Sequence, residues 1–125
     1  MAKWANNLIA DYGLNAGFQQ IAIRLAIATA QPATYANFGT YAVGTLAIAS
    51  ANFMLGTGDT NGRKLTLGAA TIVVGTSGTV THICFAATAG SGTLIFAGTC
   101  APTAVTAAGT VILAAWDVDE INDPT

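Results

Sequence analysis

The chain has 125 residues and a mass of 12.5 kDa, the size of a single domain. Four basic and six acidic residues give a net charge of −2, which leaves no basic patch for direct nucleic-acid binding. Arg24 divides the most apolar stretch, and no run of 18 apolar residues remains to predict a transmembrane helix.

Charged residues are scarce for the surface that they must cover. A folded monomer of this mass exposes about 6,200 Å², and the ten charged residues then amount to about one per 600 Å² of it. One interpretation is a weakly charged monomer that Thr, Asn and Gln keep soluble. We favour the other interpretation, in which much of the surface is buried against other subunits, because the cores of protein interfaces are depleted in charge.

The first element in the chain is a predicted short helix in the stretch KWANNLIADYGLN. Trp4, Leu8 and Tyr12 recur at i, i+4 and i+8 and share one helical face, and Gly13 ends the helix. A helix of about ten residues is marginal alone. It therefore needs a surface to dock on, in its own subunit or in a neighbour.

The period changes after this helix. In QIAIRLAIAT, large aliphatic residues at 21, 23, 25 and 27 alternate with smaller ones, and Arg24 points to the opposite face, as in a strand. The stretch TAQPATYANFG is predicted to be a loop, because Pro32 lacks a backbone donor and disfavours helix at Gln31. YAVGTLAIAS is a weaker strand, and a short one is expected near NFML.

Four further stretches are rich in β-branched or aromatic residues and bounded by Gly, Ser or Thr: KLTLGAATIVVGT, TVTHICFAAT, GTLIFAGTC and GTVILAAWDVDEI. Their spacing predicts an all-β fold, an antiparallel β-sandwich or barrel of jelly-roll-like form with a short N-terminal helix. Residues 1–18 would be a helical arm, and residues 19–125 a single β-domain.

The stretch GDTNGRKL reads as a turn and not as a ligand loop. Asn61-Gly62 tolerates positive φ, as tight hairpin turns require. A calcium loop would need a late carboxylate, and a phosphate cradle would need a helix after the glycines, but a strand follows. We expect Arg63 and Lys64 to begin that strand at an exposed edge or subunit seam. There both would remain free to pair with acids of another chain, with the Arg63 guanidinium against a neighbour's Asp117 or Asp119.

The residues that most often carry catalysis are few. His82 has no nearby acid in sequence, and a hydrogen-bonded strand histidine is the favoured interpretation. If the two strands around residues 89–92 form a hairpin, Cys84 faces Phe96 and Cys100 faces Val80. The sulfurs would then share a face about 13 Å apart, too far for a disulfide. Both cysteines are predicted to be reduced and buried.

The terminal stretch WDVDEINDPT is the only charge cluster, and we expect a solvated or partner-facing strand end there. Alternation puts Asp117 and Asp119 on one face and Glu120 on the other, which argues against a metal site. No nucleophile is paired with a base, so the sequence predicts no enzyme, no catalytic residue, no cofactor and no metal site.

Four segments in order resemble a family of small virion proteins of tailed bacteriophages. They are PATYANFGTYAVG, GDTNGRKLTLGAA, GTVTHICFAATAGSGTLIFAGTC and AVTAAGTVILAAWDVDEINDP. In that family a GD-x-x-GRK turn, a G-x-x-TH strand, an LL-x-x-G strand and a terminal A-x-D-I-x-I-x-D-P recur. The resemblance covers residues 20–125, and Leu94-Ile95-Phe96 stands where LL is usual.

The resemblance implies a structural role in the particle. We expect a capsid decoration (cement) protein that is made in the bacterial host cytoplasm, binds the capsid surface and bridges major capsid subunits. A homotrimer is favoured, with no direct contact to nucleic acid or membrane. A tail, neck or fibre-associated component and a carbohydrate-binding module for host attachment are the alternatives. The expected assembly residues are Trp4, Leu8, Tyr12, Arg63, Lys64, Asp117 and Asp119.

Overall fold

The computed structural model describes residues 3–5, 22–57, 63–88 and 91–121. The strands are β1 (Lys3–Ala5), β2 (Ile23–Ala28), β3 (Ala42–Ile48), β4 (Phe53–Thr57), β5 (Arg63–Leu67), β6 (Ala70–Val73), β7 (Gly78–Ala87), β8 (Thr93–Val105), β9 (Thr110–Leu113) and β10 (Trp116–Ile121). Helix α3 (Tyr35–Tyr41) follows β2, and a single 3-10 turn (Ser50–Asn52) precedes β4.

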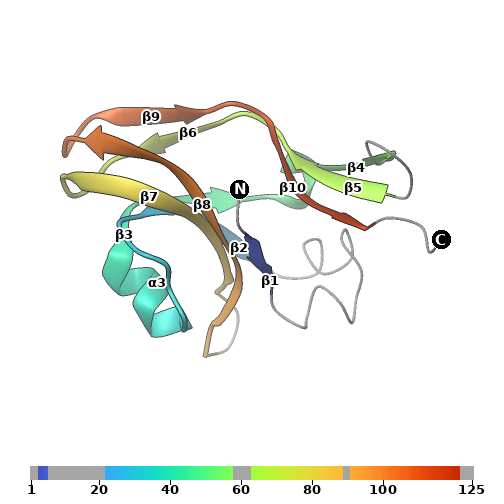
Figure 1. Cartoon of the computed structure of the whole chain (residues 1–125), viewed down its shortest axis with the longest axis horizontal. Coiled ribbons are helices and arrows are strands. Elements are labelled where there is room, and N and C mark those ends of the chain that lie inside the picture. The colour runs from blue at the N-terminus through green and yellow to red at the C-terminus, as the bar shows by residue number, and fades with distance from the viewer. Residues whose placement is uncertain (1–2, 6–21, 58–62, 89–90, 122–125) are drawn as a thin grey trace.

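The strands form two layers (Figure 1). One layer is a five-stranded antiparallel sheet in the order β1-β8-β7-β2-β3. The other contains the sheets β10-β5-β4 and β6-β9. Leu67 pairs with Trp116 and Ala70 with Leu113, so the register continues across a two-residue interruption in each strand. The predicted all-β antiparallel fold is confirmed, as an open sandwich and not a closed barrel.

The main core lies between the two layers and consists of the alternate side chains of each strand that point inward. Ile23, Leu25 and Ile27 point inward from β2, and Leu65 and Leu67 face them from β5. Three aromatic rings lie near Phe85, with centroids 5.7 Å away for Phe53 and Phe96 and 5.9 Å away for Trp116. Burial of these side chains is the main contribution to the stability of the sandwich.

A second apolar cluster covers the other face of the five-stranded sheet. Its sheet residues are small, namely Ala26, Ala28, Cys84, Ala86 and Ala97, together with Leu94. Helix α3 packs there through Phe38, with Tyr35 and Tyr41 beside it, on the side of the sheet away from β6 and β9 (Figure 1). The small side chains let the helix approach the sheet closely.

Helix α3 corrects the predicted loop at TAQPATYANFG. The loop ends at Thr34, whose side-chain oxygen accepts a hydrogen bond from the Asn37 N–H at 3.2 Å and caps the helix. Pro32 precedes the cap and therefore does not interrupt the helix.

The predicted N-terminal helix is wrong at Lys3–Ala5, which form strand β1. Trp4 pairs with Ala97 and Ala5 with Phe96 on the edge of β8. Hydrogen bonding to a sheet edge has outweighed a weak local helical pattern. The rest of the predicted helix, including Leu8 and Tyr12, lies outside the described residues.

The β7–β8 hairpin has a register one residue away from the predicted one at the cysteines. Cys84 pairs with Ala97, and a bulge between Val80 and His82 places Val80 opposite Thr103. A shift of one residue reverses the face of every side chain. Cys84 therefore belongs to the helix-side cluster, whereas Cys100 packs against the main core. Both are free, as predicted, but they do not share a face, and Cys100 is only partly buried.

Candidate assembly interface

The outward face of the β6–β9 ribbon carries large aliphatic side chains in solvent. Thr71 pairs with Ile112 and Val73 with Thr110, so these four residues share the outer face. Val73 is 64% exposed and Ile112 is 75% exposed. Their neighbours Ile72 and Val111 point the other way, toward the core. We call Thr71, Val73, Thr110 and Ile112 the ribbon face.

The chain around the ribbon face carries no charge. From Leu65 to Trp116 the sequence contains no Asp, Glu, Lys or Arg, and these residues include all of β6, β7, β8 and β9. The end of β8 adds exposed small residues, Ala101–Ala104. Exposed aliphatic side chains without charged neighbours have the composition of an interface core and not of a solvated surface.

An apolar cleft of about 300 Å³ lies beside the ribbon, between the two layers. Cys100 and Val105 of β8 line one side, and Val111 and Leu113 of β9 line the other. This cleft opens where the second layer is only two strands wide and does not cover all of the larger sheet.

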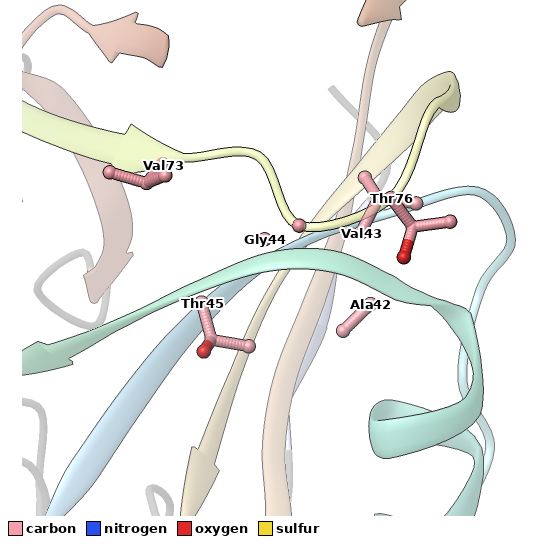
Figure 2. Close-up of a pocket in the computed structure, with 7 residues that line it drawn as sticks. Ala42, Val43, Gly44, Thr45, Val73 and Thr76 are labelled. Carbon is pink, nitrogen blue, oxygen red and sulfur yellow. The ribbon is translucent and has the colours of Figure 1, made fainter. Parts of the chain in front are cut away.

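A second hollow, of about 270 Å³, lies where β3 meets the segment after β6. Figure 2 shows Gly44 beneath this segment, with Val73 and Thr76 on either side. The backbone N–H groups of Gly75 and Thr76 both donate to the Val43 carbonyl, at 2.7 and 3.2 Å. These hydrogen bonds join the two layers at the hollow. The residues that line it are small and uncharged and include no catalytic group.

Two of the predicted assembly residues form a pair within the subunit. Lys64 Nζ lies 3.2 Å from Asp117 Oδ2, and Thr66 Oγ1 donates to Asp117 Oδ1 at 3.0 Å. Lys64 was expected to remain free for an acid of another chain, and this expectation is corrected, because its partner Asp117 lies in the same subunit. β10 lies beside β5 in the same sheet, which brings the two side chains together.

The remaining predicted assembly residues are placed only by their backbone. Arg63 begins β5 as predicted, opposite Thr57 and Ile121, but β5 has a neighbour on each side and is not an edge strand. Asp119 pairs with Leu65 in the same sheet. Trp4 lies in edge strand β1. The predicted turn at Asn61-Gly62 falls outside the described residues.

Replacing Asp117 with alanine is expected to lower the free energy of unfolding by about 1 kcal/mol or less, because the pair is partly exposed. The salt dependence of stability should fall with it. Urea unfolding at low and high salt measures both, and Thr66→Val is the control that removes the hydroxyl but keeps the charges. A loss of several kcal/mol on Asp117→Ala would contradict a weakly coupled surface pair.

The titratable groups of strands β7 and β8 are His82, Cys84 and Cys100, of which Cys100 lines the cleft. Burial, with a smaller contribution from Cys100, raises the pKa of Cys84 to about 12, and burial also raises the pKa of Cys100. Both thiols are therefore protonated near neutral pH and weakly nucleophilic. His82 Nδ1 shares a 2.8 Å hydrogen bond with Thr81 Oγ1, which confirms the hydrogen-bonded strand histidine, and burial lowers the pKa of His82.

Within the described residues, no three of His, Cys, Asp and Glu gather in a way that could hold a metal ion. Among the same residues, no helix has the length and apolar character needed to cross a membrane.

Comparison with known proteins adds no relative. No protein-family model, no curated protein and no solved structure matches the chain.

The sequence analysis did not predict the ribbon face. The stretches ATIV and TVIL each contain one Thr among aliphatic residues, and only the pairing of β6 with β9 shows which aliphatic residues point outward. The absence of charge from Leu65 to Trp116 was the available signal.

Proposed function

We propose that the protein is a bacteriophage virion structural protein, and specifically a capsid decoration protein that binds the head surface and bridges major capsid subunits. The observation that carries the proposal is the ribbon face, with Val73 and Ile112 exposed in a part of the chain without charge. Covering such an apolar surface with another protein lowers the free energy of the system. The four sequence segments that resemble small phage virion proteins are the reason for proposing a phage particle as the assembly.

Repetition makes weak contacts sufficient for this role. A decoration protein meets the same capsid surface many times around a symmetric lattice, and linked weak contacts add to a strong attachment. The trimer favoured from the sequence would cluster three copies at one lattice position, and closed cyclic symmetry is usual for homo-oligomers.

A carbohydrate-binding module would need exposed aromatic rings. The aromatic side chains that the structure describes, from Tyr35 to Trp116, are all buried or half-buried, and the exposed large side chains are aliphatic. Among the described residues, the exposed surface therefore favours a protein partner over a glycan.

The test is the number of copies per particle, measured by quantitative mass spectrometry of purified phage with the major capsid protein as internal standard. A decoration protein is expected at hundreds of copies. Six or twelve copies would overturn the proposal in favour of a tail or neck component, and absence from the particle would overturn a virion role altogether.

A further inference from the structure

We infer that strand β9 pairs edge to edge with β9 of a second copy of this chain, antiparallel and across a two-fold axis. This inference is independent of the proposed virion role, since two copies can pair without a capsid. It predicts a two-fold dimer in place of the homotrimer favoured from the sequence. It rests on the open edge of β9, the apolar cleft beside it and the exposure of Ile112.

The edge of β9 is unprotected. Within the described part of the chain, β9 forms a ladder with β6 alone, and it runs along the upper rim of the molecule in Figure 1. Open edges usually carry proline or charge that blocks pairing. β8 has Pro102 beyond its contact with β1, and β10 has Asp117, Asp119 and Glu120, whereas β9 reads Thr-Val-Ile-Leu. The edge strands β3 and β4 also lack proline and charge, but the apolar cleft lies beside β9.

The cleft beside β9 would receive the inward side chains of a strand paired with β9. Val111 and Leu113 point into it, opposite Cys100 and Val105 of β8, and it is only partly enclosed. A strand added to the edge of β9 would widen the second layer over this part of the larger sheet. Its inward apolar side chains would cover the cleft.

The described residues on either side of positions 6–21 lie away from β9. Residues 6–21 start after Ala5, which pairs with Phe96, and end before Ile23, which pairs with Ala87. Those positions lie toward the β7–β8 turn, at the opposite end of the hairpin from the cleft, which Val80 and Val105 line. The other such segments lie before β1, between β4 and β5, between β7 and β8, and after β10.

The absence of charge favours a second copy as the occupant. A charged side chain on a partner would be buried against this uncharged surface without a counter-charge, which is unfavourable. A second copy presents the same uncharged surface, free of Asp, Glu, Lys and Arg from Leu65 to Trp116. Two copies therefore meet without repulsion or an unpaired charge.

Side-chain parity fixes the register. Opposite residues of an antiparallel pair point to the same face, so Val111 must face an inward residue of the second copy. With Ile112 opposite Ile112 on the axis, Val111 lies opposite the second copy's Leu113. The inward pairs then cover the two clefts, and the two Ile112 side chains, each 75% exposed in one subunit, cover one another.

The test compares Ile112→Lys with Val73→Lys. Both residues are exposed aliphatics on the ribbon face, but only Ile112 lies on β9 at the proposed axis. By light scattering and sedimentation equilibrium, we expect the wild type to approach twice 12.5 kDa with rising concentration. Ile112→Lys should raise the dimer Kd by about tenfold or more, whereas Val73→Lys should leave it within about threefold. Far-UV circular dichroism and thermal unfolding confirm that both variants fold.

Cross-linking gives a second readout. In a Cys84→Ala, Cys100→Ala background, Ile112→Cys should form a disulfide between copies on mild oxidation, because opposite residues of paired strands lie within disulfide reach. Val73→Cys should not. A wild type that is monomeric at all concentrations overturns the inference, as does a trimer insensitive to Ile112→Lys. Growth to larger rings or filaments would mean that β9 pairs head to tail with another edge, and overturns it too.

Discussion

Replacing Phe85 with alanine is expected to lower the free energy of unfolding by about 3–5 kcal/mol. The Phe85 ring is fully buried, and the rings of Phe53, Phe96 and Trp116 surround it with centroids within 5.9 Å. The change would remove contacts from both layers at once and leave a cavity between them. A domain of this size has a total stability of about 5–15 kcal/mol, so much of it would be lost.

Urea unfolding followed by tryptophan fluorescence and by far-UV circular dichroism measures this loss. Phe85→Leu is the matched control, because it keeps most of the volume and should cost less than about 1.5 kcal/mol. A loss below about 1 kcal/mol on Phe85→Ala would contradict a shared core at this position and would separate the layers energetically.

Replacing Gly44 with alanine is expected to destabilise the protein by about 1–3 kcal/mol. A Cβ at this position would lie 2.8 Å from the Val73 carbonyl oxygen and 2.9 Å from Ile72 Cγ2. The carbonyl belongs to the backbone and cannot turn away, since Gly44 is bridged to Val74 and the Gly75 N–H donates to the Val43 carbonyl (Figure 2). The added methyl group would push β3 away from β6 where the two layers join.

Gly39→Ala is the control for Gly44→Ala. A Cβ on Gly39 would meet no heavy atom within 4 Å, and the residue lies inside helix α3. Alanine should therefore raise stability there by about 0.5–1 kcal/mol. Thermal unfolding should shift down for Gly44→Ala and up for Gly39→Ala. An upward shift in both variants would show that backbone entropy, and not the contact with Val73, decides the effect at Gly44.

The strands that were predicted best from the sequence are those in which the alternating large side chains are also the buried ones. In β2, Ile23, Leu25 and Ile27 alternate with small residues and face the main core, and exposed Arg24 lies on the opposite face. The long stretch from Lys64 to Thr76 was harder, because it contains two strands of different sheets with Gly68-Ala69 between them. Continuous β propensity does not show where a strand changes partner.

Other elements depend on partners distant in the chain. Lys3–Ala5 form a strand because the edge of β8 is available, which the local pattern of Trp4, Leu8 and Tyr12 does not contain. Helix α3 had a readable signal in Thr34, followed three residues later by Asn37, but its seven residues are too short for periodicity to identify.

The residues of the candidate interface also depend on strand pairing that the local sequence pattern does not show. The scarcity of charge was visible in the sequence and indicated contact with other subunits, but it did not say which residues take part. Lys64 and Asp117 were expected to face another chain, and the pairing of β5 with β10 brings them together within one subunit. Ile112 and Val73 could be distinguished from core residues only after the β6–β9 register was known.

We propose that the uncharged β6–β9 ribbon is an assembly surface of a virion protein. An electron cryomicroscopy reconstruction of the particle, at a resolution that traces this chain, tests it most directly. We expect the sandwich on the outside of the head, with Val73 and Ile112 covered by a neighbouring protein chain. A reconstruction that places the chain in the tail, or that leaves both side chains facing solvent on the head, would contradict it.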